Sequence, residues 1–266
     1  MRWSERQRDM LRAMGVRLFD AIRSSQAPAP AVVPVSTPPP ATPTPPATAA
    51  KPAPRQMPAP VAAPAPAMSG HARPDVAALG WPELRAAVAD CRACALSESR
   101  QQTVFGVGHA RAHWMVIGEA PGEQEDRQGE PFVGPAGQLL DNMLRALGLT
   151  REEAGPERQV FIANTLKCRP PKNRNPDAAE TACCAPYLER QIALVQPRII
   201  LAMGRFAAHA LLASDEPLGR LRGRLHEWRG VPVVVTYHPA YLLRTPSDKA
   251  RAWEDLCLAA SVVQGS

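Results

Sequence analysis

A stretch rich in proline and alanine limits what this chain can fold into. Residues 27–67 hold 15 prolines and 13 alanines in 41 positions, with no acidic and no aromatic residue. Such a segment buries too little apolar surface to offset the entropy lost on ordering, and it favours extended polyproline II backbone. The sequence therefore predicts a basic peptide over residues 1–26, a disordered linker over 27–74, and a folded domain over 75–266. That last part is long enough for one sizeable core.

The positive charge of the chain is unevenly distributed. The formal net charge is +6, of which residues 1–26 and residues 27–74 each supply +3. The remaining segment has 22 basic and 22 acidic residues, so its net charge is zero. The high isoelectric point is therefore no reason to class the folded domain as nucleic-acid binding.

The N-terminus lacks the features of an export signal. Four arginines within the first 12 residues interrupt any apolar stretch, and no run approaches the roughly 18 apolar residues of a membrane span. We expect a cytoplasmic, monomeric protein. In that compartment the six cysteines (91, 94, 168, 183, 184 and 257) are metal ligands or reduced thiols more often than disulfides.

Apolar runs alternate with helical patterns from residue 81 onward. Four short runs are expected to form strands, at 113–118, 159–163, 198–203 and 231–237. Helices are expected at 81–90, 136–147, 177–195, 205–213 and 247–262. This alternation predicts an α/β domain, a three-layer α/β/α sandwich around a short, mainly parallel four-stranded sheet.

Polar side chains follow three of the predicted strands. Glu119 comes after the first strand, Asn164 after the second and His238 after the fourth. Ligands of open parallel sheets bind at the carboxyl ends of the strands. An acid, an amide and an imidazole are therefore expected to converge at one edge of the sheet.

Longer motifs at the same places resemble a known family. GEAPGEQEDRQGEPFVGPAGQLLDNML (118–144), NTLKCRPPKNR (164–174) and TYHPAYLLR (236–244) closely resemble the family 4 uracil-DNA glycosylases, the iron–sulfur branch of their superfamily. CRACALSESR (91–100) and RGR (222–224) fit the same family. The resemblance covers about residues 81–260. It implies a monofunctional DNA repair enzyme that flips uracil out of single- or double-stranded DNA and hydrolyses its N-glycosidic bond, leaving an abasic site for base excision repair.

The resemblance also assigns the residues that bind the base. Asn164 is the base reader, and its amide can donate to uracil O4 while accepting from N3–H. Phe132 is the aromatic platform on which uracil stacks, a contact typically worth about 1–3 kcal/mol per base. Backbone N–H groups around Ala120 bind a pyrimidine carbonyl.

The chemistry is assigned in the same way. His238 resembles the donor to the departing O2, as a neutral or a protonated imidazole. Glu119 resembles the acid that orients water and stabilises the cationic sugar. Glu125 and Asp126 follow closely and are held in reserve for that role.

The cysteine pattern alone leaves the kind of metal site open. Cys91-x-x-Cys94 is compatible with zinc, redox and iron–sulfur sites, and two adjacent cysteines at 183–184 are a poor pair for one metal. The family's ligand spacing implies that Cys91, Cys94, Cys168 and Cys184 hold a 4Fe–4S cluster, with Cys183 and Cys257 free. We expect the cluster to pin separate loops together rather than to catalyse.

Two basic runs and one leucine pair are expected to contact DNA. The first run is Lys167, Arg169, Lys172 and Arg174; the second is Arg220, Arg222, Arg224 and Arg229. The predicted contacts are Lys172, Arg174, Arg222, Arg224 and Arg244, although solvated surface arginines are the alternative. Leu242 or Leu243 resembles the wedge that enters the helix where a base has left.

Residues 4–23 form a weak amphipathic pattern broken by Gly15. Residues 7–19 (QRDMLRAMGVRLF) loosely resemble the peptide with which the psi subunit of the bacterial replicative polymerase holds its chi partner. Docking of residues 1–26 on a replication protein is therefore one hypothesis, and a solvated helix is the other.

Two other functions compete with uracil excision. The first is a non-enzymatic iron–sulfur or zinc protein that binds nucleic acid, which would not need the Glu119, Asn164 and His238 set. The second is a glycosylase of the same fold with a different base preference, such as hypoxanthine.

Overall fold

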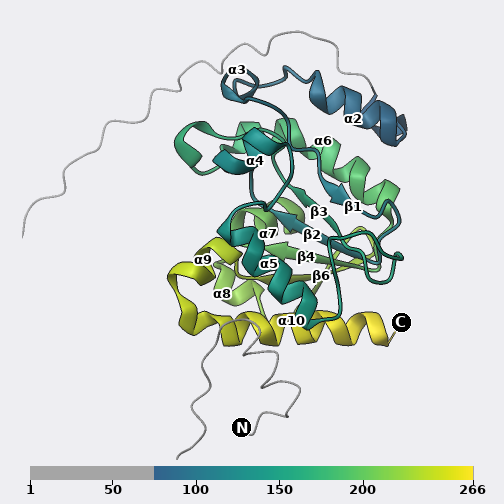
Figure 1. The fold of residues 1–266 in the computed structure, drawn as a ribbon, viewed down its shortest axis with the longest axis vertical. Coiled ribbons are helices and arrows are strands. Elements are labelled where there is room, and N and C mark those ends of the chain that lie inside the picture. Colours follow the sequence, from purple (N-terminus) through teal and green to yellow (C-terminus); the bar gives the residue numbers. More distant parts are fainter. Residues whose placement is uncertain (1–74, 266) are drawn as a thin grey trace, which may run out of the picture. The chain divides into compact units, whose positions relative to one another are not determined.

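The computed structural model describes residues 75–265, and the predicted N-terminal peptide and linker lie outside them. Six strands form one sheet in the order β1-β3-β2-β4-β6-β5 (Figure 1). The four inner strands run parallel. They are β3 (Phe161–Asn164), β2 (Trp114–Gly118), β4 (Ile199–Met203) and β6 (Val231–Thr236). These are the four strands expected from the sequence, which confirms the α/β fold.

The two edge strands were not predicted. β1 (Val107–Gly108) pairs antiparallel with β3, and β5 (Leu225–Trp228) pairs antiparallel with β6. β1 has two residues, too few to produce a periodic pattern. β5 lies at the edge, with Leu225 half exposed, so it lacks the continuous apolar run of a buried strand.

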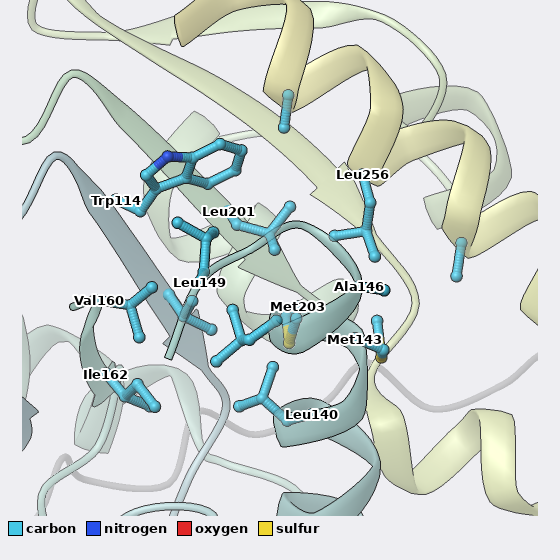
Figure 2. Packing of buried hydrophobic residues seen from close by; sticks show 14 of the residues in the cluster. Trp114, Leu140, Met143, Ala146, Leu149, Val160, Ile162, Leu201, Met203 and Leu256 are labelled. Carbon is cyan, nitrogen blue, oxygen red and sulfur yellow. The ribbon is translucent and has the colours of Figure 1, made fainter. Parts of the chain in front are cut away.

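Helices cover both faces of the sheet. On β2, Trp114 and Val116 point into a core shared with α5 (Pro135–Ala146) and α10 (Lys249–Gln264). Met115 and Ile117 point to the other face, towards α6 (Ala178–Val195) and α7 (Arg205–Leu212). This alternation is the two-residue period of a strand buried on both sides. Figure 2 shows the first of these cores, in which Leu140 and Met143 of α5 and Leu256 of α10 lie with Trp114 and Leu201.

The sequences of α5 and α6 explain where these two helices begin. Pro135 occupies the first turn of α5, where its missing N–H costs nothing. Asp177 caps α6, with Glu180 completing a capping box. The expected helix at 81–90 is α2 (Trp81–Ala89). Short elements complete the chain: η1 (Val76–Ala78), α3 (Leu96–Ser99), α4 (Glu123–Gln128), η2 (Pro171–Asn173), α8 (Leu218–Leu221), α9 (Pro239–Arg244) and η3 (Pro246–Asp248).

None of the helices within residues 75–265 combines the length and the apolar character required to cross a bilayer.

Candidate functional site

A cavity of about 700 Å³ opens at the carboxyl ends of the parallel strands. The structure brings the five residues predicted to bind and cleave around this one space: Glu119, Ala120, Phe132, Asn164 and His238. They come from three different segments, after β2, at the end of β3 and after β6. The convergence follows from the parallel arrangement, which places the ends of the strands at one edge of the sheet.

Gly118 makes room for two of these side chains. It pairs in register with Asn164 across β2 and β3. A Cβ atom at residue 118 would come closer than 3.0 Å to the Asn164 amide oxygen and to the Phe132 ring. Asn164 itself is only 2% exposed. Sequence reasoning did not single out Gly118, although it is the first residue of the GEAPG motif.

Glu119 lies directly after Gly118 and lines the cavity. Its main-chain carbonyl accepts hydrogen bonds from the Leu166 N–H at 3.1 Å and from the Thr165 hydroxyl. Its carboxylate, by contrast, forms no hydrogen bond among residues 75–265. Burial raises the pKa of this carboxyl, and the charge of Arg205 partly offsets that rise. The backbone fixes the position of Glu119 and leaves its carboxylate free for a ligand.

The two reserve acids hold the loop that surrounds the cavity. Glu125 accepts the Phe132 N–H at 3.0 Å and also the Gly122 N–H. Asp126, 1% exposed, accepts the Gln101 N–H at 3.0 and 3.2 Å. Both carboxylates are thus occupied by backbone donors, which favours Glu119 as the reacting acid.

Phe132 is held in an unusual conformation. Its φ of 56° lies in the left-handed region, which is uncommon for a bulky residue. Glu125 binds its N–H, and Arg151 donates to its carbonyl at 3.0 Å. The ring stacks on the His238 imidazole with centroids 5.3 Å apart and an interplanar angle of 26°. Arg151 was missed by sequence reasoning because no motif marks a residue that acts through a backbone carbonyl.

The geometry around His238 indicates its protonation state. His238 is the N-cap of α9, and its Nδ1 accepts the Ala240 N–H at 3.2 Å. Burial lowers its pKa to about 4, with a smaller contribution from Arg244. The imidazole is therefore neutral near pH 7 and carries its proton on Nε2. A neutral donor thus lines the cavity.

A second, smaller cavity is lined by cysteines. Five of the six cysteines surround it, from three segments: Cys91, Cys94, Cys168, Cys183 and Cys184. Cys257 lies on α10 and packs against a different core. The sulfur of Cys168 accepts a hydrogen bond from Arg100 at 3.0 Å, and the sulfur of Cys184 accepts the Lys167 N–H at 3.3 Å. The Cys183 thiol instead donates to the Ala93 carbonyl at 3.6 Å.

These contacts fit the donor set of an iron–sulfur cluster. Sulfurs that accept N–H bonds are typical of thiolate ligands, and a sulfur that donates is typical of a free thiol. Burial raises the pKa of the Cys184 thiol to about 12, so a metal must displace its proton. Within residues 75–265, no three histidine, cysteine or acidic side chains are grouped closely enough to hold one metal ion. A four-iron cluster takes one thiolate per iron, so its ligands spread more widely.

The basic residues predicted to contact DNA differ in their availability. Arg174 and Arg244 line the large cavity, and Lys172 is exposed on the adjacent turn. Arg174 is 46% exposed and is paired with Glu180 at 2.5 Å. Arg224 is about half exposed and paired with Glu216 at 2.9 Å. Arg222 is 12% exposed and forms an ion pair at 3.0 Å with the fully buried Asp255. The guanidinium of Arg222 is therefore engaged by Asp255 within the protein and is largely inaccessible to DNA.

Burial bears on two further sequence expectations. Leu242 is fully buried in the core, whereas Leu243 is 44% exposed, so only Leu243 is free to enter a DNA helix. Lys167 was placed with the basic surface run, and this was wrong. Its side chain is 1% exposed, because it lies under α6 between the two cavities.

Comparison with known proteins gives a consistent result. Residues 105–257 match the Uracil DNA glycosylase superfamily. The chain is 41% identical over 184 residues to a type-4 uracil-DNA glycosylase of Pyrobaculum aerophilum, covering 66% of this chain and 91% of the relative. It is 39% identical over 181 residues to a type-4 uracil-DNA glycosylase of Thermotoga maritima, with the same two coverages. A DNA polymerase of Bacillus phage SP01 is 26% identical over 170 residues, 64% of this chain but 18% of the polymerase.

Proposed function

Because this chain belongs to the type-4 group of the uracil-DNA glycosylase superfamily, we propose that it excises uracil from DNA by hydrolysing the N-glycosidic bond. The product is an abasic site, the entry point of base excision repair. The observation that carries this proposal is the convergence of Glu119, Asn164 and His238 on one cavity beside Phe132. A protein that merely binds nucleic acid has no need for this set.

Uracil is read at the end of β3. The Asn164 amide donates to O4 and accepts from N3–H, a pattern that cytosine cannot match. The buried position of Asn164 removes competing water, which strengthens both bonds. The Ala120 N–H has no acceptor among the described residues and lines the cavity, so it is available to a pyrimidine carbonyl. Phe132, partly covered by His238, supplies the stacking surface.

The bond between C1′ of the sugar and N1 of uracil breaks with its electron pair leaving on the base. The sugar becomes cationic, and the Glu119 carboxylate stabilises it while orienting a water molecule. Water adds to C1′ and its proton passes to Glu119. The neutral His238 donates from Nε2 to uracil O2, where the negative charge of the leaving group develops.

The cysteine cavity holds a 4Fe–4S cluster in this proposal. Its ligands are Cys91, Cys94, Cys168 and Cys184, with Cys183 left as a free thiol. The cluster supplies iron–thiolate bonds that tie the segment after α2, the loop after β3 and the helix α6 together. The chain's own acid and imidazole perform the hydrolysis in the other cavity.

DNA contacts are proposed for the exposed or cavity-lining residues Lys172, Arg174, Arg224 and Arg244. They neutralise phosphates around the flipped nucleotide. Leu243 fills the space vacated by the base. Arg222 is left out of this set because it is only 12% exposed and its donors bind the buried Asp255.

The remaining sequence predictions stay predictions. A cytoplasmic location, a monomeric state and docking of residues 1–26 on a replication protein rest on the sequence alone. Lack of binding between a 1–26 peptide and chi would dispose of the docking hypothesis.

A panel of oligonucleotides tests the proposed function. Single- and double-stranded oligonucleotides carrying uracil, hypoxanthine or thymine at one position are incubated with the full chain, and abasic sites are then cleaved with alkali. Cleavage at uracil in both contexts is expected. Cleavage at hypoxanthine in preference to uracil would support the same fold with another base, and no cleavage anywhere would favour a binding protein.

A further inference from the structure

Lys167 is a buried cation that no step of the hydrolysis uses. Its side chain is 1% exposed, among the largest fully buried side chains of the domain. The ammonium group donates to the main-chain carbonyl of Asn164 at 2.8 Å and to the Gln191 side-chain oxygen at 2.7 Å. A buried charge persists only where partners and nearby opposite charge offset its desolvation. The Asn164 carbonyl and the Gln191 side-chain oxygen are the partners of this ammonium group.

Both ends of residue 167 are fixed to α6. The Lys167 N–H donates to the Cys184 sulfur at 3.3 Å, and the ammonium reaches Gln191, seven residues further along the helix. Residues seven apart lie on one face of a helix, so the two anchors are two turns apart on the side that faces β3. Gln191 is itself fixed, since its amide donates to the Phe105 carbonyl at 2.8 Å.

The same lysine is joined to the uracil cavity by the backbone. Its partner, the Asn164 carbonyl, belongs to the residue whose side chain is the proposed base reader. Directly after Asn164, the Thr165 N–H donates to the Gly118 carbonyl at 3.0 Å and the Leu166 N–H to the Glu119 carbonyl at 3.1 Å. The end of β3 is therefore held between Lys167 on one side and the Glu119 segment on the other.

We propose that Lys167 is a positioning residue that fixes the base-reading end of β3 against α6 and the cysteine cavity. It does not touch DNA. It fixes the position of the Asn164 amide, so that uracil recognition depends on the contacts of Lys167 with the Asn164 carbonyl and with Gln191. This role rests on the proposed function, because it concerns how Asn164 meets uracil.

The test compares binding of two oligonucleotides that differ only in the base. Cleavage is prevented by Glu119→Gln, and dissociation constants are measured for DNA with uracil and for the same DNA with an abasic site. Adding Lys167→Met is expected to lower the preference for uracil about 10-fold while binding of abasic DNA is unchanged, because the amide no longer meets the base correctly. Iron content per chain, measured on the same samples, is expected to stay at the parental value. Arg158→Met, which removes an exposed cation elsewhere, is the matched control.

A purely structural role gives a different result. If Lys167 only stabilised the fold, the variant would bind both oligonucleotides less, in proportion to the unfolded fraction, and an unchanged uracil preference would overturn the proposal. Gln191→Met removes the other anchor and is expected to lower the preference several-fold; it decides the matter if Lys167→Met does not fold. The parental chain is assayed for uracil release in parallel. No release there contradicts the proposed function, whereas release with unaltered preference in both variants contradicts this inference alone.

Discussion

The two cavities of this domain use their polar groups in opposite ways. Around the large cavity, the Glu119 carboxylate and the Ala120 N–H have no partner among the described residues, and the Nε2 proton of His238 is available. Around the cysteine cavity, Arg100 and Lys167 direct their donors at sulfurs and carbonyls. Glu119, Ala120 and His238 are half-buried, so their unpaired polar groups are accessible to a ligand. This difference supports our proposal that the first cavity is the reacting site and the second a structural one.

Glu119→Gln provides the largest expected effect. The amide cannot take a proton from water or stabilise a cationic sugar, so kcat/KM on uracil DNA should fall about 10³-fold, or about 4 kcal/mol. Single-turnover kinetics measure this. Thermal stability should remain close to the parental value because the carboxylate holds no other group. Glu130→Gln, at an exposed position of the same segment, should keep parental kinetics, and near-normal turnover in Glu119→Gln would show that another acid reacts.

Cys184→Ser tests the structural side of the comparison. Loss of one ligand should abolish the absorbance at about 400 nm expected of a thiolate-bound iron–sulfur cluster and lower the free energy of unfolding by about 3 kcal/mol. Cys183→Ser is the matched control at the adjacent residue and should retain iron and colour. Colourless parental protein with stoichiometric zinc would refute the cluster.

Gly118→Ala disturbs two residues of the large cavity, Asn164 and Phe132, with one substitution. The added methyl group would lie too close to both the Asn164 amide and the Phe132 ring, so both must shift. Overpacking of this kind costs about 1–3 kcal/mol, and we expect kcat/KM to fall about 30-fold. The affinity for abasic DNA should change little. Parental kinetics in Gly118→Ala would mean that Asn164 and Phe132 do not need their present positions.

Leu242 and Leu243 are adjacent on α9, but Leu242 is buried and Leu243 is exposed, so their substitutions should have different effects. Leu243→Ala removes an exposed side chain and should reduce activity on duplex DNA about 5-fold, with a smaller effect on single strands and none on stability. Leu242→Ala empties a core position and should instead lower the free energy of unfolding by about 2–5 kcal/mol. If activity on duplex DNA falls in Leu242→Ala but not in Leu243→Ala, Leu243 is not the wedge.

The pH dependence of turnover sharpens the assignment of the acid. Glu119 must be ionised to act, and burial raises its pKa, so activity should fall as the pH drops towards the acidic range. His238, with a pKa of about 4, stays neutral through that fall. Arg205→Gln removes the cation that lowers the pKa of Glu119, so the acidic limb of the profile should move to higher pH. If the acidic limb of the profile is the same in Arg205→Gln and in the parental chain, that limb does not report the ionisation of Glu119.

Some of this architecture follows from the sequence by simple physics. The four inner strands are buried on both faces and therefore appear as continuous apolar runs. The polar residues that follow three of them must lie at one edge of a parallel sheet. α5 is equally clear because Leu139, Leu140, Met143 and Leu144 recur at helical spacing.

The features that sequence reasoning missed depend on contacts between distant segments. In the sequence, Lys167 belongs to a run of arginines and lysines and therefore resembles a surface residue. In the structure, α6 covers it, and Gln191 of that helix accepts a hydrogen bond from its ammonium group. The choice between Leu242 and Leu243 depends on which way one helical turn faces. Cys183 and Cys184 are distinguished by the direction of their hydrogen bonds and by burial, since only Cys184 is buried. Patterns along the chain carry no information of this kind.

The most direct test of the central claim is to follow free uracil released from a uracil-containing oligonucleotide together with the integrity of the strand. We expect one uracil released per abasic site formed, a strand that stays intact until alkali is added, and no protein–DNA product trapped by borohydride. Release of uracil should be lost in Glu119→Gln and retained in Glu130→Gln. Absence of uracil release by the parental chain, or strand breakage with a borohydride-trapped adduct, would contradict hydrolysis by water in this cavity.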